Sequence, residues 1–272
     1  MANIMDILAR FRLNPIGLLA DIEKAFLQIS LEESQRDCVR FFWYDDQPHE
    51  FFGDNKVIPY RMKRLTFGVN ASPFVLNQVI QTQLDSFSNK FPAEVDSMKM
   101  SFYMDDLVIS VPSPHAAKSL YKSAKEIFSD MKMNLRGWTT NDKCVQEWLT
   151  SYGEESMAVE NVTKVVGTVW NLEQDCFCFQ FKWPSEPVST KRQFLSAYAS
   201  IWDPLGVLSP LLATIKFIFQ KIWSLNLDWD TQLPSEILNQ INQCVSSFQL
   251  CETLNLPRFI DVASGEISLH CF

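Results

Sequence analysis

The spacing of apolar residues predicts that the first part of the chain alternates strands with helices. Ile16–Ala20 is an unbroken apolar run, typical of a buried strand, and it ends at Asp21. Ser72-Pro73 predicts a helix start, with the serine as N-cap and the proline at the first helical position. Pro114–Met131 has the spacing of an amphipathic helix. The order of these elements predicts an antiparallel sheet with packing helices.

Segments rich in β-prone residues predict strands joined by tight turns. Asp105-Asp106 occupies one such turn, between an alternating run from Met98 to Phe102 and an apolar run that begins at Leu107. Two further hairpins are expected, in which Cys38–Tyr44 pairs with Glu50–Phe52 and Lys164–Trp170 pairs with Cys176–Phe181.

The composition changes near Trp183-Pro184, and the segments that follow predict helices over Lys191–Trp202, Val207–Ser224 and Ser235–Phe248. We therefore expect a domain boundary near residues 172–188. The sequence predicts an α+β fold, with an antiparallel sheet and packing helices in residues 1–180 and a mainly helical region in residues 181–272.

Composition limits the function classes. The 272 residues are 47% hydrophobic and 13% aromatic, which is enough for a packed core and excludes a disordered tail. Lysine and arginine number 24 against 32 acidic residues, so the net charge is −8 and nucleic-acid binding would depend on local basic segments or metal ions. No signal peptide is present, and Pro210, Lys216 and Lys221 interrupt the most apolar stretch, so we expect an intracellular, cytoplasmic protein without a membrane partner.

Three carboxylates carry the candidate chemistry. Asp21 follows one apolar strand, and Asp105 and Asp106 lie in the turn of a hairpin whose strands are expected to join the same sheet. Converging carboxylates repel one another, and a cation relieves that repulsion. Hard oxygen ligands suit Mg²⁺, and a pair of Mg²⁺ ions is a known device for phosphoryl transfer. Taken alone, an Asp-Asp pair in a hairpin more often marks a solvated turn.

The order of four motifs resembles that of reverse transcriptases. Asp21–Phe26 is similar to their first catalytic motif, and Tyr103–Asp106 is similar to their third. The second motif corresponds to Leu65–Val69 followed by Ser72–Phe74, and Lys164–Trp170 resembles the hairpin that grips the primer end. Within the family, Phe67-Gly68-Val69, Asp203-Pro204-Leu205-Gly206 and Leu208-Ser209-Pro210 resemble the BEL/Pao lineage of long-terminal-repeat retrotransposons.

The resemblance implies an RNA-directed DNA polymerase palm over residues 1–180, with partial fingers, and a helical thumb or connection over residues 181–272. Asp21 and Asp105 would bind two Mg²⁺ ions, for which Mn²⁺ is an alternative, while Asp106 would complete the cluster and the Ile22 carbonyl would be a further ligand. The implied nucleotide-binding residues are Phe26, which would select deoxynucleotides by its ring, and Phe67, Gly68, Tyr103 and Met104. The implied primer grip is Val166, Gly167 and Thr168.

The implied partners are an RNA or DNA template, a DNA primer, deoxynucleoside triphosphates and the rest of a polyprotein with fingers, RNase H and integrase. Template phosphates are expected to contact the basic run Lys56–Arg64, Lys191-Arg192, and Lys216 with Lys221. Trp170 and Trp202 are interpreted as core residues.

Fingers precede the first motif in reverse transcriptases, whereas Asp21 lies near the start of this sequence. Ile267–Phe272 resembles the strand that leads into the first carboxylate of RNase H. We therefore expect a segment of a polyprotein that extends primers poorly by itself. Two alternatives are a catalytically inactive retroelement remnant that at most binds nucleic acid, and a different palm-fold nucleotidyltransferase.

Overall fold

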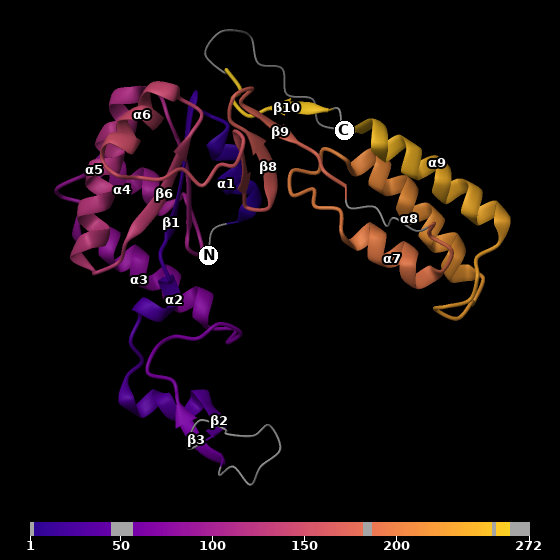
Figure 1. The fold of residues 1–272 in the computed structure, drawn as a ribbon, viewed down its shortest axis with the longest axis horizontal. Helices are drawn as coiled ribbons and strands as arrows, with labels where there is room; N and C mark the ends of the chain where they lie inside the picture. The colour runs from indigo at the N-terminus through magenta and orange to yellow at the C-terminus, as the bar shows by residue number, and fades with distance from the viewer. Residues whose placement is uncertain (1–2, 45–56, 182–186, 252–253, 262–272) are drawn as a thin grey trace.

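The computed structural model describes residues 3–44, 57–181, 187–251 and 254–261. It has a mixed α+β architecture, which confirms the predicted fold class. A main sheet with helices on one side lies at the left of Figure 1, a small two-stranded unit projects below it, and a second sheet lies between the main sheet and a group of three helices.

The main sheet has the strand order β4-β5-β1-β6 and is antiparallel throughout. Its strands are β1 (Ile16–Ile22), β4 (Phe102–Tyr103), β5 (Asp106–Val111) and β6 (Leu135–Thr140). Strand β1 lies in the middle and is buried along most of its length, which explains its unbroken apolar sequence.

Each face of the main sheet is covered by different elements. One face packs against the helices α3 (Ser72–Ser86), α4 (Pro92–Lys99), α5 (Pro114–Asp130) and α6 (Lys143–Ser151). Alternate residues of β1 such as Leu18 and Ala20 belong to this core, whereas Leu19 points to the opposite face. There it packs against α1 (Ile4–Phe11) and residues of the second sheet.

The second sheet has the order β10-β9-β8-β7 and combines segments from distant parts of the chain. Its strands are β7 (Val162–Val165), β8 (Thr168–Asn171), β9 (Cys176–Cys178) and β10 (Asn255–Pro257). Strand β10, which was not predicted, returns after the three C-terminal helices to pair with β9. Arg258 follows directly and is fully buried, with hydrogen bonds to Asp175 and to the carbonyl groups of Phe11, Asn14 and Pro15.

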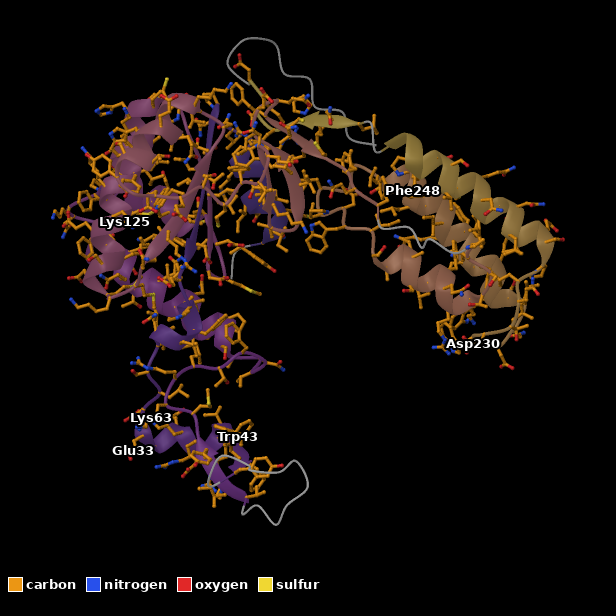
Figure 2. All side chains as sticks on the ribbon, viewed as in Figure 1. Glu33, Trp43, Lys63, Lys125, Asp230 and Phe248 are labelled. Atoms are coloured by element: carbon orange, nitrogen blue, oxygen red, sulfur yellow. The ribbon has the colours of Figure 1, made fainter. Side chains whose placement is uncertain are left out.

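The projecting unit consists of the 3-10 helix η1 (Glu33–Val39) and the hairpin of β2 (Arg40–Tyr44) and β3 (Val57–Arg61). The short helix α2 (Ala25–Gln28) lies between it and the main sheet. Glu33, Trp43 and Lys63 lie on this unit, away from the main sheet (Figure 2). Phe42 and Trp43 are 75% and 60% exposed, so the hairpin leaves aromatic surface uncovered.

The C-terminal helices are α7 (Lys191–Ala199), α8 (Ser209–Ser224) and α9 (Ser235–Cys251), as predicted within a few residues at most ends. They enclose a separate apolar core that includes Phe194, Ile215 and Phe248. Asp230 and Phe248 mark this helical group in Figure 2. None of the helices in the described part of the chain is long and apolar enough to cross a membrane.

Three local predictions were wrong. The run that begins at Met98 does not form a strand, because Val95 and Met98 lie on the buried face of α4 and only Phe102–Tyr103 is extended. Ser72 is not the N-cap of α3, since its hydroxyl donates to the Thr66 carbonyl at 2.6 Å. The segment Lys164–Trp170 is not one strand, because it turns at Val166 and Gly167 and so contains the β7–β8 hairpin; only β8 pairs with β9. Strand β2 pairs with β3, and the expected strand Glu50–Phe52 lies outside the described residues.

Candidate active site

A tight turn between β4 and β5 presents two of the three candidate carboxylates. Tyr103 pairs with Asp106 across the hairpin, so the turn consists of Met104 and Asp105. Met104 has a positive φ of 57°, as hairpin turns of types I′ and II′ require at this position. Asp106 lies directly opposite Asp21 on β1, and the Ile22 amide donates to the Asp105 carbonyl at 3.0 Å. The backbone therefore fixes all three residues relative to one another.

The carboxylates of Asp21, Asp105 and Asp106, here called the acidic triad, converge at this turn. Each offers an oxygen within 4.8 Å of the others, and each residue is half-buried. Burial, together with the charges of Asp105 and Asp21, raises the pKa of Asp106 to about 6. Burial and the charge of Asp105 also raise the pKa of Asp21. The site therefore carries negative charge that the protein only partly compensates.

A cation on β6 supplies part of that compensation. Arg136 lies opposite Asp21 in the sheet, with its Nε 4.0 Å from Asp21 Oδ2 and its Nη1 3.1 Å from Glu23 Oε1. Asn134 donates to the other oxygen of Glu23 at 3.1 Å, and this bond lowers the pKa of Glu23 together with the charge of Arg136. Neither Arg136 nor Glu23 was predicted as a site residue, because only the pairing of β1 with β6 brings them together.

The donor set fits a hard divalent cation. All three groups are carboxylates, they lie near enough to share ions, and their exposure leaves room for water ligands. A groove of about 580 Å³ opens beside Asp21, and its lining includes Arg136 and Lys125, which forms an ion pair with Glu154 at 2.7 Å. The triad itself offers the ligands that Mg²⁺ or Mn²⁺ would need.

The predicted nucleotide-binding residues lie on α2, on the segment before α3 and on the β4–β5 hairpin. Phe26 is 6% exposed on α2, and its ring meets the edge of Phe67 with 5.0 Å between centroids. Phe67 is 68% exposed, and Gly68 has a φ of 83° with open space around its Cα. Tyr103 is half-buried on β4 and packs against the cluster formed by α1 and the second sheet. The structure thus brings Phe26 and Phe67 together.

The predicted primer-grip residues form the turn of the β7–β8 hairpin. Val165 pairs with Thr168, so Val166 and Gly167 are the two turn residues, with φ angles of 47° and 84°. Thr168 is 9% exposed, and its hydroxyl has no hydrogen-bond partner among the residues that the structure describes. Val165 and Val166 pack against the same cluster as Leu19 of β1. The hairpin is therefore anchored on the back of the main sheet.

The basic residues expected to contact phosphate differ in accessibility. Arg61 forms an ion pair with Asp37 at 3.2 Å and remains 43% exposed at its side chain. Lys191 is 6% exposed, and its Nζ lies 3.5 Å from the centre of the Trp223 ring. Lys191 therefore stabilises the helical group from within and does not face a phosphate.

Comparisons with known proteins agree with this site. Residues 3–153 match the family described as reverse transcriptase (RNA-dependent DNA polymerase), and residues 190–272 match the Pao retrotransposon-like RNaseH-like domain. Among solved structures, the chain is similar to the foamy viral protease-reverse transcriptase in complex with an RNA/DNA hybrid, with a TM-score of 0.57 and 11% sequence identity.

The structural match covers 94% of this chain and 30% of the foamy viral chain, so the likeness concerns the fold. No protein with a curated function matches the chain. The reverse transcriptase match alone spans more than half of the sequence and includes the whole acidic triad. The chain belongs to the reverse transcriptase family, and its C-terminal segment is of the Pao retrotransposon type.

Proposed function

We propose that this chain is the palm and thumb of an RNA-directed DNA polymerase that adds deoxynucleotides to a primer with the help of two divalent ions. The observation that carries the proposal is the acidic triad, whose three carboxylates reach one another within 4.8 Å at the end of the central strand. Family membership supports the reaction class, and the geometry of the triad supports the choice of these three residues as metal ligands.

In the proposed reaction, the primer 3′-hydroxyl oxygen attacks the α-phosphorus of a deoxynucleoside triphosphate. A new phosphodiester bond forms, the bond to the leaving pyrophosphate breaks, and the hydroxyl proton passes to solvent. Two Mg²⁺ ions, when bound, lower the pKa of the hydroxyl and offset charge on the phosphates. Asp21 and Asp105 would hold both ions, Asp106 would complete the site, and the Ile22 carbonyl would be an added ligand.

Residues around the triad would hold the substrates. Phe26 and Phe67 would lie beside the sugar and base of the incoming nucleotide, with Gly68 allowing close approach of the backbone. Tyr103 and Met104 would border the nucleotide from the hairpin, and the turn from Val166 to Thr168 would hold the primer end. The groove beside Asp21 offers space for the triphosphate, and Arg136 would offset part of its charge.

The proposed ligands are an RNA or DNA template and a DNA primer. The foamy viral enzyme with a similar fold was solved in complex with an RNA/DNA hybrid, which supports this choice. The proposed protein partners are the remaining parts of a retrotransposon polyprotein, including fingers, RNase H and integrase, because the chain corresponds to 30% of that viral chain. We further propose that the polyprotein works inside the cell, where its nucleic-acid substrates are.

Primer extension tests the proposal. The chain, an Asp105→Asn variant and an Asp85→Asn variant are incubated with a DNA primer on an RNA template, deoxynucleotides and Mg²⁺. Asp85 is an exposed aspartate of α3 that pairs with Lys99, so its variant controls for loss of a carboxylate elsewhere. Because we expect this chain to extend primers poorly by itself, the expected extension is slow; it depends on Mg²⁺, is abolished by Asp105→Asn and is unchanged by Asp85→Asn.

Two results would contradict the proposal. Extension that survives Asp105→Asn would remove the triad from the reaction. Binding of the RNA/DNA hybrid without any incorporation by the wild-type chain would favour the alternative of an inactive remnant that only binds nucleic acid. Far-ultraviolet circular dichroism of each variant shows whether lost activity reflects a lost fold.

A further inference from the structure

The turn at the tip of the β7–β8 hairpin has an unfavourable sequence for its conformation. Both turn residues have positive φ angles, 47° at Val166 and 84° at Gly167, which is the pattern of a type I′ turn. Glycine adopts this conformation freely, but a β-branched residue such as valine does so rarely. A strained turn persists only where its surroundings hold it in place. A contact from the surrounding structure must therefore hold Val166 in this conformation.

Trp202 makes that contact from the segment between α7 and α8. Its indole Nε1 donates a hydrogen bond to the Val166 carbonyl at 3.0 Å. The same ring lies against Gly167 so closely that a Cβ at this position would be 2.9 Å from Nε1 and 3.2 Å from Cε2. Trp202 thus holds the first turn residue by a hydrogen bond and the second by contact. It is 51% exposed, which differs from the core position expected from the sequence.

The loop after Trp202 is itself well fixed, so the indole has a defined position. The Asp203 carboxylate accepts hydrogen bonds from the Val207 amide at 3.0 Å and the Leu208 amide at 2.8 Å. Leu205 packs against the apolar cluster that anchors the second sheet. Helix α8 begins directly after this loop, at Ser209. The start of α8 and the hairpin turn are therefore joined through Trp202.

We propose that Trp202 is a positioning residue for the primer end, because it clamps the Val166–Gly167 turn in the geometry that the hairpin needs. The inference rests on the proposed function of this hairpin as the primer grip. Trp202 touches neither substrate nor metal ligand in this proposal. It acts through the Val166 carbonyl, and it links the placement of the turn to the placement of the C-terminal helices.

Hydrogen exchange of the chain tests the clamp without any need for activity. Trp202→Phe retains an aromatic ring but removes the N–H donor, and exchange of the amides in residues 162–171 should become about two- to tenfold faster, as loss of one hydrogen bond implies. Trp223→Phe is the matched control, because Trp223 is 53% exposed on α8 and the same substitution there should leave the hairpin unchanged.

A second substitution separates the clamp from general packing. Asn-Gly is the preferred pair for a type I′ turn, so adding Val166→Asn to Trp202→Phe should restore slow exchange in the hairpin. Unchanged exchange in Trp202→Phe would overturn the clamp. Val166 also packs against the apolar cluster of the second sheet, so Val166→Asn alone serves as the reference. Exchange that is slow in Val166→Asn but fast in the double variant would also overturn the clamp, because Trp202 would then act through packing elsewhere.

Single-nucleotide addition then tests the link to the primer. Trp202→Phe should lower kcat by about two- to tenfold while the KM for the deoxynucleotide stays the same, and the double variant should recover. If the exchange results hold but kcat does not change, the clamp stands and the assignment of this hairpin as the primer grip is wrong. If exchange does not respond, the clamp itself is wrong, whatever the kinetics show.

Discussion

Replacing Arg258 with methionine should destabilise the fold by about 3–5 kcal/mol, the usual result of removing one member of a buried ion pair. The Arg258 side chain has no exposed surface, and its Nε and Nη2 contact the two oxygens of Asp175 at 2.6 and 2.8 Å. Methionine keeps the unbranched apolar part of the side chain but lacks the guanidinium group. The loss would therefore come from the polar partners that remain and from the contacts of the guanidinium with the Phe11 and Trp170 rings.

Those polar partners come from the N-terminal part of the chain as well as from the turn before β9. The guanidinium also donates to the carbonyls of Phe11, Asn14 and Pro15, at 2.5, 2.9 and 2.5 Å. Each hydrogen bond to a charged group contributes about 1.5–3 kcal/mol, but such values do not add in one network, and the Asp175 carboxylate keeps its bond from Trp170 at 3.0 Å. The estimate of about 3–5 kcal/mol is therefore well below the simple sum.

Chemical denaturation followed by circular dichroism measures this loss. The control is Arg192→Met, because Arg192 makes the same two-pronged contact with Asp230, at 2.8 and 2.9 Å, on the protein surface. Its side chain is 62% exposed, so the control should lose much less stability than Arg258→Met. The reasoning from burial would be refuted if both variants lowered the free energy of unfolding equally. It would also be refuted if Arg258→Met lowered it by less than about 1 kcal/mol.

Three further predictions concern residues of the main sheet and of α2. Without divalent ions, Asp106→Asn should raise the free energy of unfolding at pH 7.5 and leave it unchanged near pH 3.5. The pKa of Asp106 is raised to about 6 in the folded chain, so the wild-type protein loses stability as pH rises from about 4 through 6 and the carboxylate ionises. Asparagine stays neutral and avoids that loss. The raised pKa implies a gain in stability of roughly 3 kcal/mol at pH 7.5, which partial exposure of Asp106 reduces to about 1–2 kcal/mol. A stability difference between variant and wild type that does not change with pH would contradict this reasoning. Gly17→Ala should cost about 1–3 kcal/mol in urea denaturation, since its Cβ would lie 2.8 Å from the Phe11 ring; a neutral effect would show that the ring moves freely. Phe26→Val should admit ribonucleotides in primer extension with little loss for deoxynucleotides, and unchanged discrimination would limit Phe26 to its role in the core.

Local patterns in the sequence were sufficient for the parts of the site that lie on single elements. The apolar run before Asp21 indicates the central strand, and the apolar run after Asp106 indicates β5. The turn itself was placed one residue too late, because Asp106 is already paired in β5 and the turn is Met104-Asp105. The resemblance to reverse transcriptases adds that these two segments meet. Their contact in the structure is the cross-strand pair of Asp21 with Asp106, which no pattern within either segment contains.

Features that depend on pairing between distant segments were missed. The sequence around Arg136 does not distinguish it from an ordinary surface arginine, and only the pairing of β6 with β1 places it beside Asp21. Strand β10 has only three residues and ends in proline, so its pairing with β9, and not its own propensity, makes it extended. Arg258 gives no sign of burial in the sequence, because its partners come from α1, the start of β1 and the turn before β9.

The most direct test of the central claim counts the divalent ions at the acidic triad. Electron paramagnetic resonance measures Mn²⁺ bound to the chain in the presence of a primer on RNA and a nonhydrolysable deoxynucleotide analogue. The account predicts two ions per wild-type chain and the loss of at least one in Asp105→Asn, with Asp85→Asn unchanged. Equal Mn²⁺ binding by wild type and Asp105→Asn, or no bound ion in the wild-type chain, would contradict the two-metal polymerase site.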